Sequence, residues 1–171
     1  ARVNGIIESV LQLSRRKQPE PELLDLNSWL KQDIDDFTAG GTTNAEILCR
    51  LDPANPQGRF DPNQLSQGIA NLLGNGLRYS EQKTGKAVVH VETGLTEQQQ
   101  AYIDIIDEGP CISDELREHL FEPFFTTEKQ GTGLGLYISR ELCEANQAQL
   151  DADTAETGGC RFRITFAHPK R

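Results

Sequence analysis

The chain has 171 residues, of which 26 are acidic and 17 are basic, and its formal net charge is −9. A chain of this length buries roughly 70% of its unfolded surface and needs no disulfide staples, and its four cysteines lack paired spacing, which indicates a reducing compartment. The negative charge argues against a nucleic-acid partner, and the sequence shows no signal peptide and no apolar run near the ~18–20 residues that span a bilayer.

The first predicted element is a helix over residues 2–16. Its apolar side chains recur at helical spacing and form one stripe: Val3, Ile6, Ile7, Val10 and Leu13. The stripe fits a surface helix of the domain, and it equally fits a bundle helix that seeks a partner chain. The following segment, PEPELLDL, is interpreted as an extended linker interrupted by proline.

The next elements lead to a long helix. Residues 27–37 predict a helix, residues 46–51 a strand and residues 53–58 a turn. Residues 61–80 then predict a helix with Asp61 as N-cap and Pro62 in its first turn. One face of this helix is apolar: Leu65, Ile69, Leu72, Leu73 and Leu77.

Two asparagines lie one helical turn apart in this helix, at Asn71 and Asn75. Amide oxygens are hard, neutral ligands that suit a Mg²⁺ ion carrying nucleotide phosphates. Two solvated amides would give the same pattern, so the helix alone leaves both interpretations open.

An acidic turn ends the next strand pair, predicted over residues 86–92 and 101–106. In the turn Asp107-Glu108-Gly109-Pro110, a partly buried carboxylate at the rim of the sheet would accept a hydrogen bond from the exocyclic amine of a purine. Capping of the turn by Asp107 is the alternative.

A glycine-rich loop, Gly131-Thr132-Gly133-Leu134-Gly135-Leu136, precedes an amphipathic segment over residues 137–148. Glycines at alternate positions expose backbone N–H groups, which can bind phosphate near a helix N-terminus, although tight packing also uses such loops. Residues 150–153 and 160–166 then predict a hairpin that completes the sheet. The elements together predict an α/β two-layer sandwich, a mixed sheet with helices on one face.

Four segments, in the order NLLGNGLRYS, DEGP, FEPFFTT and GTGLGL, resemble the ATP-binding catalytic domain of sensor histidine kinases, which has the Bergerat-type (GHKL) ATPase fold. The resemblance covers residues 60–166, and FEPFFTT before a short lid at residues 128–131 is most similar to the nitrogen-regulatory and type IV pilus-regulatory sensor kinases. It implies that residues 1–24 are the end of a dimerisation and phosphotransfer helix with its linker, and that residues 25–171 are the catalytic domain.

The resemblance also implies roles for single residues. Asn75 would bind Mg²⁺ with Asn71 beside it, Arg78 would face phosphate where the family usually has Lys, and Tyr79 would line the adenine side. Asp107 would pair with the adenine amine, and Gly109 would let the base approach the backbone. The lid and phosphate loop would supply Lys129, Gly131, Thr132, Gly133, Leu134, Gly135 and Leu136. The aromatic segment would anchor the lid through Phe121, Phe124 and Phe125.

Two positions depart from the family pattern. Cys111 replaces a glycine of the acidic turn, and Gly76 replaces the usual alanine after the second asparagine. A residue with a Cβ at position 111 would cost on the order of 1 kcal/mol if the backbone there needs positive φ. A glycine inside a helix costs up to ~1 kcal/mol relative to alanine.

The chain shows no phosphoacceptor context around its histidines: His90 falls in a strand, His119 at a helix end and His168 in the tail. The resemblance therefore implies transfer of the γ-phosphoryl group of Mg-ATP to a histidine on a segment absent from this chain. It implies three partners besides ATP: a histidine-bearing dimerisation domain, a response regulator and a second copy of the full-length protein. The domain is expected to be cytoplasmic, in a protein anchored in the bacterial inner membrane.

Two other functions remain open. An ATP-hydrolysing relative is disfavoured, because such ATPases carry a Glu four residues before the metal-binding asparagine, where this chain has Asn71, and a neutral amide cannot take a proton. A regulatory interaction module that keeps the fold without using ATP is suggested by Cys111.

Overall fold

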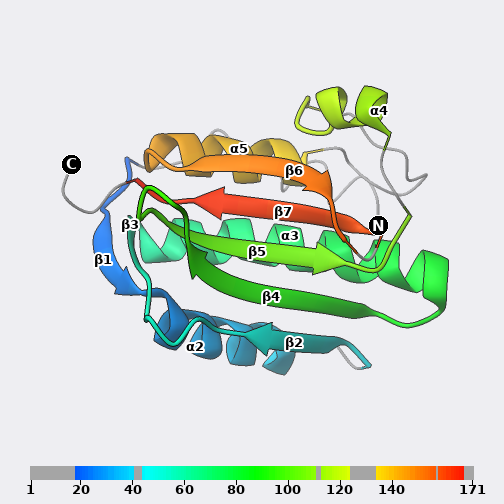
Figure 1. Cartoon of the computed structure of the whole chain (residues 1–171), viewed down its shortest axis with the longest axis horizontal. Coiled ribbons are helices and arrows are strands. Elements are labelled where there is room, and N and C mark those ends of the chain that lie inside the picture. Colours follow the sequence, from blue (N-terminus) through cyan, green and yellow to red (C-terminus); the bar gives the residue numbers. More distant parts are fainter. Residues whose placement is uncertain (1–17, 41–43, 111–112, 124–133, 157, 168–171) are drawn as a thin grey trace.

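The structure is a computed structural model that describes residues 18–40, 44–110, 113–123, 134–156 and 158–167 (Figure 1). The helix predicted over residues 2–16, the lid at 128–131, Phe124, Phe125, His168 and Cys111 lie outside the described residues.

A five-stranded mixed sheet forms one layer, in the order β2-β4-β5-β7-β6 (Figure 1). Its strands are β2 (Glu46–Arg50), β4 (Val88–Leu95), β5 (Ala101–Asp107), β6 (Gln149–Thr154) and β7 (Cys160–Thr165). β2 and β4 are parallel, whereas the other neighbours are antiparallel. In the antiparallel pairing of β4 with β5, Val89 lies opposite Asp107, so the acidic turn begins where the paired strands end.

Helices form the second layer. α2 (Leu26–Ala39), α3 (Pro62–Thr84) and α5 (Gly135–Ala145) lie behind the sheet in the view of Figure 1, and the short α4 (Asp114–His119) lies beyond the edge strand β6. The predicted two-layer sandwich, with helices on one face of a mixed sheet, is confirmed.

The core lies between the two layers. Alternate residues of β4 and β5 point inward and are buried, including Val89, Val91, Ile103 and Ile105. The apolar face predicted for α3 meets them, and four of its five residues are fully buried: Leu65, Ile69, Leu72 and Leu73. Each such side chain contributes about 1.5–3 kcal/mol relative to full exposure, so this packing fixes α3 on the sheet.

Both ends of α3 follow from local chemistry. Asp61 is the N-cap, and its Oδ1 accepts hydrogen bonds from the backbone N–H groups of Asn63 and Gln64, at 2.9 and 3.2 Å. The helix continues four residues past its predicted end at Ser80. It ends at Thr84, because Gly85 adopts the left-handed conformation with φ 81°.

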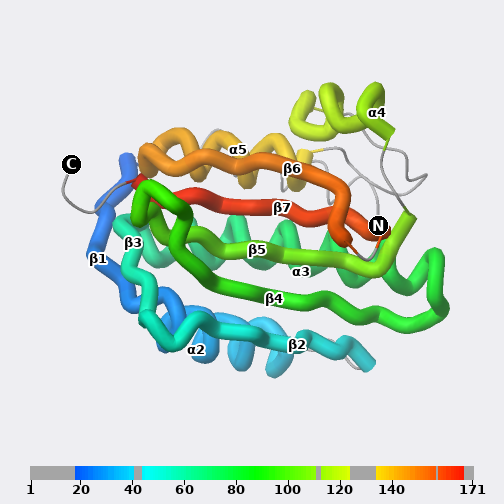
Figure 2. The backbone as a smooth tube through the Cα atoms, in the orientation of Figure 1, coloured from blue at the N-terminus to red at the C-terminus, as the bar shows by residue number. Residues whose placement is uncertain are grey.

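A second, two-stranded sheet was not predicted. β1 (Glu22–Asp25) pairs antiparallel with β3 (Gln57–Phe60), and Figure 2 shows them side by side at one end of the molecule. The end of PEPELLDL is therefore extended, as expected, but it forms a strand rather than an unpaired linker. The expected turn at residues 53–58 likewise ends in strand β3. The division of the chain between residues 24 and 25 stays a prediction.

Candidate nucleotide site

Three residues of α3 bring the helix against the acidic turn. A Cβ on Gly76 would lie 3.4 Å from Cβ of Asp107, and a Cβ on Gly109 would lie 2.7 Å from Cβ of Tyr79. The hydroxyl of Ser80 accepts a hydrogen bond from the backbone N–H of Glu108, at 2.8 Å. Positions 76, 79 and 80 share one helical face, so the structure brings together the asparagine helix and the acidic turn predicted to form one site.

Asp107 is the most buried acidic side chain at this junction, with 1% exposure. Its Oδ1 accepts hydrogen bonds from the backbone N–H groups of Gly109 (2.9 Å) and Cys160 (3.0 Å). Burial raises the pKa of Asp107 above the usual 3.8, against the lowering effect of these two bonds and of Lys83. The turn-capping role and the ligand-binding role of Asp107 are therefore compatible, because one oxygen can cap the turn while Oδ2 serves a further donor.

The second neighbour of Asp107 comes from a segment that sequence reasoning did not connect with the site. Cys160 begins β7, next to the end of β5, and a Cβ on Gly159 would overlap the backbone carbonyl oxygen of Asp107. Only a residue without a side chain lets the β6–β7 turn approach so closely. The one available signal was the Gly158-Gly159 pair, which lies in the turn of the hairpin predicted over residues 150–153 and 160–166.

Asn75 is buried on α3, with 7% exposure. Its Oδ1 accepts a hydrogen bond from Nη2 of Arg78 at 3.3 Å, whereas its Nδ2 is buried without a hydrogen-bond partner among the described residues. An unsatisfied buried amide costs about 1–3 kcal/mol, which is typical of a group held for a ligand.

Asn71 and the start of α5 are joined. The Nδ2 group of Asn71 donates a hydrogen bond to the backbone carbonyl oxygen of Gly135, at 3.4 Å. α5 begins at Gly135, two residues before the predicted start of the amphipathic segment, and it ends at Ala145 rather than Ala148. Its N-cap, Leu134, makes no side-chain capping bond, so no N-cap side chain competes for the N–H groups of the first turn.

The other residues predicted for the phosphate loop divide into two groups. Leu134 is fully buried in a small apolar cluster with Ile138 and Leu142, and Leu136 packs against the main core. Both side chains thus have packing roles. Lys129, Gly131, Thr132 and Gly133 lie outside the described residues.

The aromatic segment is anchored at its first phenylalanine. The ring of Phe121 packs edge-on against Phe162 of β7, with 6.2 Å between centroids, and the guanidinium of Arg140 lies 5.3 Å from its centre. The predicted packing role of Phe121 is consistent with this contact. Through these two contacts, Phe121 holds the segment before the lid against β7 and α5.

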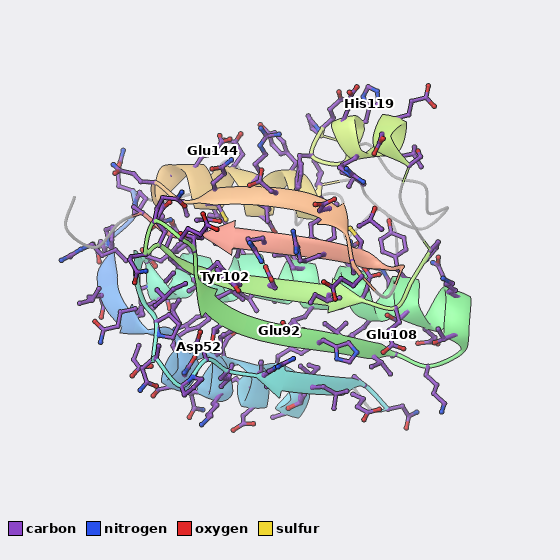
Figure 3. All side chains as sticks on the ribbon, in the orientation of Figure 1. Asp52, Glu92, Tyr102, Glu108, His119 and Glu144 are labelled. Carbon is purple, nitrogen blue, oxygen red and sulfur yellow. The ribbon has the colours of Figure 1, made fainter. Side chains whose placement is uncertain are left out.

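Two of the three histidines lie where they were expected, His90 within β4 and His119 at the end of α4. His90 Nε2 lies 2.8 Å from a carboxylate oxygen of Glu108, which Figure 3 labels near the end of β5. His119 Nδ1 lies 2.9 Å from Glu122, and this hydrogen bond raises the pKa of His119. Both imidazoles thus have carboxylate partners.

None of the described helices is both long and apolar enough to cross a membrane.

Comparison with known proteins identifies the family to which the domain belongs. The histidine kinase-, DNA gyrase B- and HSP90-like ATPase family matches residues 60–170. Sensor protein kinase PilS of Pseudomonas aeruginosa is 47% identical over 171 residues, which cover 99% of this chain and 32% of PilS. The chain thus spans about a third of that relative.

Two solved structures share the fold. Full-length ShkA in complex with AMPPNP has a TM-score of 0.78 at 20% identity, over 96% of this chain and 35% of ShkA. ThkA in complex with the response regulator TrrA has a TM-score of 0.76 at 21% identity, over 96% of this chain and 47% of that chain. Because the family match extends over well more than half of the sequence, this chain belongs to the histidine kinase-, DNA gyrase B- and HSP90-like ATPases, and it contains the ATP-binding catalytic domain of a two-component sensor histidine kinase.

Proposed function

We propose that this domain binds Mg-ATP between α3, the acidic turn and the start of α5, and that it transfers the γ-phosphoryl group to a histidine on another segment. The observation that carries the proposal is the buried carboxylate of Asp107, both of whose backbone hydrogen bonds go to Oδ1, beside the helix on which Nδ2 of Asn75 is buried without a partner among the described residues.

Asp107 recognises the base. Its Oδ2 accepts a hydrogen bond from the exocyclic amine of adenine, and the low polarity of its surroundings strengthens that bond. Gly109 and Tyr79 border the adenine side, and the absence of a side chain on Gly109 lets the turn lie against Tyr79. Guanine presents a carbonyl oxygen in place of the amine, so the site favours ATP over GTP.

Asn75 is the protein ligand for Mg²⁺. Its amide oxygen is a hard ligand. In the structure this oxygen accepts a hydrogen bond from Arg78, which the metal would share or replace, and Nδ2 has no partner among the described residues. Asn71 lies one turn earlier and links this position to α5. When bound, Mg²⁺ would neutralise phosphate charge.

The phosphates lie toward the first turn of α5. Gly135 and the N–H groups that lack a side-chain cap provide the anion site, and Arg78, Lys129, Gly131, Thr132 and Gly133 complete it. Positioning and charge neutralisation are the main requirements of phosphoryl transfer, and this site supplies both.

The phosphoacceptor histidine belongs to a dimerisation domain of the full-length protein. The described histidines His90 and His119 are each held by a carboxylate, so neither is proposed as the acceptor. The full-length protein would be a membrane-anchored homodimer with this domain in the cytoplasm, and a response regulator would receive the phosphoryl group. A crystal structure shows ThkA in complex with the response regulator TrrA.

Phosphotransfer to a separately produced dimerisation hairpin tests the proposal. The wild-type chain, mixed with Mg²⁺, ATP labelled in its γ-phosphate and the histidine-bearing hairpin of the same full-length protein, should label the hairpin in an acid-labile, base-stable form. A hairpin with its histidine replaced by Gln is the control. Labelled free phosphate without hairpin labelling would instead indicate the ATP-hydrolysing alternative, and unconsumed ATP would indicate the interaction module.

A further inference from the structure

The hydroxyl of Ser80 joins the helix layer to both strands at the edge of the site. Ser80 is fully buried on α3. Its Oγ donates a hydrogen bond to the backbone carbonyl oxygen of Val88 at 2.7 Å and accepts one from the backbone N–H of Glu108 at 2.8 Å. Val88 belongs to β4, and Glu108 is the first residue after β5.

This arrangement differs from the usual behaviour of serine in a helix. A helical serine commonly returns its hydroxyl to the carbonyl oxygen of its own preceding turn. Here the hydroxyl instead bridges two strands just beyond their last paired residues, Val89 and Asp107. Only a group that donates and accepts at once can fill that place, and Ser and Thr are the small side chains that do so at neutral pH.

The bridge fixes the backbone directly after Asp107. On one side of the carboxylate, β5 is held by its pairing with β4. On the other side, Ser80 holds the N–H of Glu108, and the backbone of Tyr79 lies against Gly109. The direction of the Asp107 side chain therefore depends on a residue that does not touch the carboxylate.

From these contacts we infer that Ser80 is a positioning residue for base recognition: its hydroxyl sets where Asp107 presents Oδ2 and thereby determines selectivity for the 6-amino group of adenine. The inference rests on the proposed function, because it assumes that Asp107 receives that amine. It adds that Ser80, which does not touch the nucleotide, controls the selectivity of the site for the 6-amino group.

The test separates base recognition from general stability of the domain. Affinities of the 171-residue chain are measured by calorimetry for Mg-ATP and for the Mg²⁺ complex of purine riboside triphosphate, which lacks only the 6-amino group. The ratio of the two affinities isolates the amine contact, because both ligands share the phosphates, the ribose and the ring.

Three variants of Ser80 and one control define the expected pattern. Ser80→Ala removes the hydroxyl, Ser80→Cys fills the volume with a weak hydrogen-bonding group, and Ser80→Thr keeps the hydroxyl. The control, Thr84→Ala, removes a hydroxyl that bonds to the carbonyl oxygens of Ser80 and Lys86, within the helix end and the turn after it. The ratio should fall about fivefold or more in the Ala and Cys variants and stay near the wild-type value in the Thr variant and the control.

Two results would overturn the inference. If both affinities fall by the same factor, so that their ratio is constant, Ser80 has only a structural role, and if neither affinity changes, the bridge does not control Asp107. The Cys variant decides the matter if the Ala variant does not fold. A wild-type ratio near one, unchanged by Asp107→Asn, would instead remove the adenine assignment itself, so failure of the proposed function and failure of the Ser80 inference give different patterns.

Discussion

Asp107 shows a conflict between stability and binding at a single residue. Burial raises its pKa, which means that the charged carboxylate is less favourable in the folded protein than in the unfolded chain. Two backbone N–H groups compensate at Oδ1. The remaining cost is consistent with a carboxylate kept for a ligand, as expected where function and stability compete.

Replacing Asp107 with Asn should separate these two effects. The amide oxygen can still accept both backbone bonds, but an NH₂ group would then face the adenine amine, donor against donor. ATP affinity should fall at least tenfold, which corresponds to ~1.4 kcal/mol, while the melting temperature should stay the same or rise. Calorimetric titration and thermal unfolding measure the two quantities, and an unchanged affinity would contradict the role given to Asp107.

The raised pKa of Asp107 also predicts a pH dependence. As pH falls through the pKa of the folded protein, which lies above the usual 3.8, Asp107 gains a proton and stops accepting the amine. The affinity ratio between ATP and purine riboside triphosphate should therefore decline at a higher pH than an ordinary aspartate would give. The ratio cancels titration of the phosphates, which the two ligands share, and a ratio constant down to pH ~4 would contradict this prediction.

The raised pKa of Asp107 has the opposite consequence for folding: the protein loses stability as pH rises, whereas ligand binding gains from the rise. The native state binds the proton more tightly than the unfolded chain, so the contribution of Asp107 to the free energy of unfolding decreases as pH rises from 3.8 through the folded pKa. In the protein without nucleotide, Asp107→Asn should flatten this part of the pH–stability curve.

At the scale of elements, the close approach of α3 to the sheet is the main determinant of the site. Gly76 permits it, because a Cβ there would lie 3.0 Å from Cγ2 of Val89 and 3.4 Å from Cβ of Asp107. The glycine that departs from the family pattern thus has a local reason in this chain. The absence of a Cβ lets the asparagine helix pack closely against the acidic turn.

A matched pair of glycine substitutions tests this packing. Gly68 is on the same helix, and a Cβ there would meet no atom within 4 Å, so Gly68→Ala should raise the free energy of unfolding by about 0.5–1 kcal/mol. In Gly76→Ala, the crowded contact with Val89 should cancel this gain in the free energy of unfolding, and ATP binding should weaken. Denaturant titration and calorimetry measure both variants. Equal stabilisation with unchanged binding would show that the helix does not need to lie so close.

Elements with strong local signals could be predicted from the sequence. Asp61 and Pro62 mark the start of α3, and the alternation of Tyr102 to Ile106 marks β5, because caps and periodicity are local properties. β1 and β3 were missed as strands because each has only four residues and their pairing joins Glu22 to Phe60 across the fold. The contact of Ser80 with the acidic turn left no residue pattern, and that of Cys160 left only the Gly158-Gly159 pair, since backbone N–H groups and tertiary hydrogen bonds do not require a particular sequence.

At the scale of the molecule, one helix serves both halves of the proposed site. α3 carries Asn75 for the metal, and its residues Tyr79 and Ser80 hold the turn that recognises the base. Nucleotide binding must also overcome a net charge of −9, because ATP is itself anionic. Arg78, Mg²⁺ and the N–H groups of the first turn of α5 therefore have to reverse the potential locally.

The most direct test of this account is a calorimetric titration of the chain with ATP, with and without Mg²⁺, in the wild type and in Asn75→Ala, with GTP as the control for base selection. We predict ATP-selective binding that Mg²⁺ strengthens in the wild type, and loss of the Mg²⁺ effect in Asn75→Ala. Stability should change little, because the substitution removes the hydrogen bond to Arg78 together with the buried Nδ2 group that has no partner among the described residues. Absence of binding at millimolar ATP, or an Mg²⁺ effect that persists in Asn75→Ala, would contradict the account.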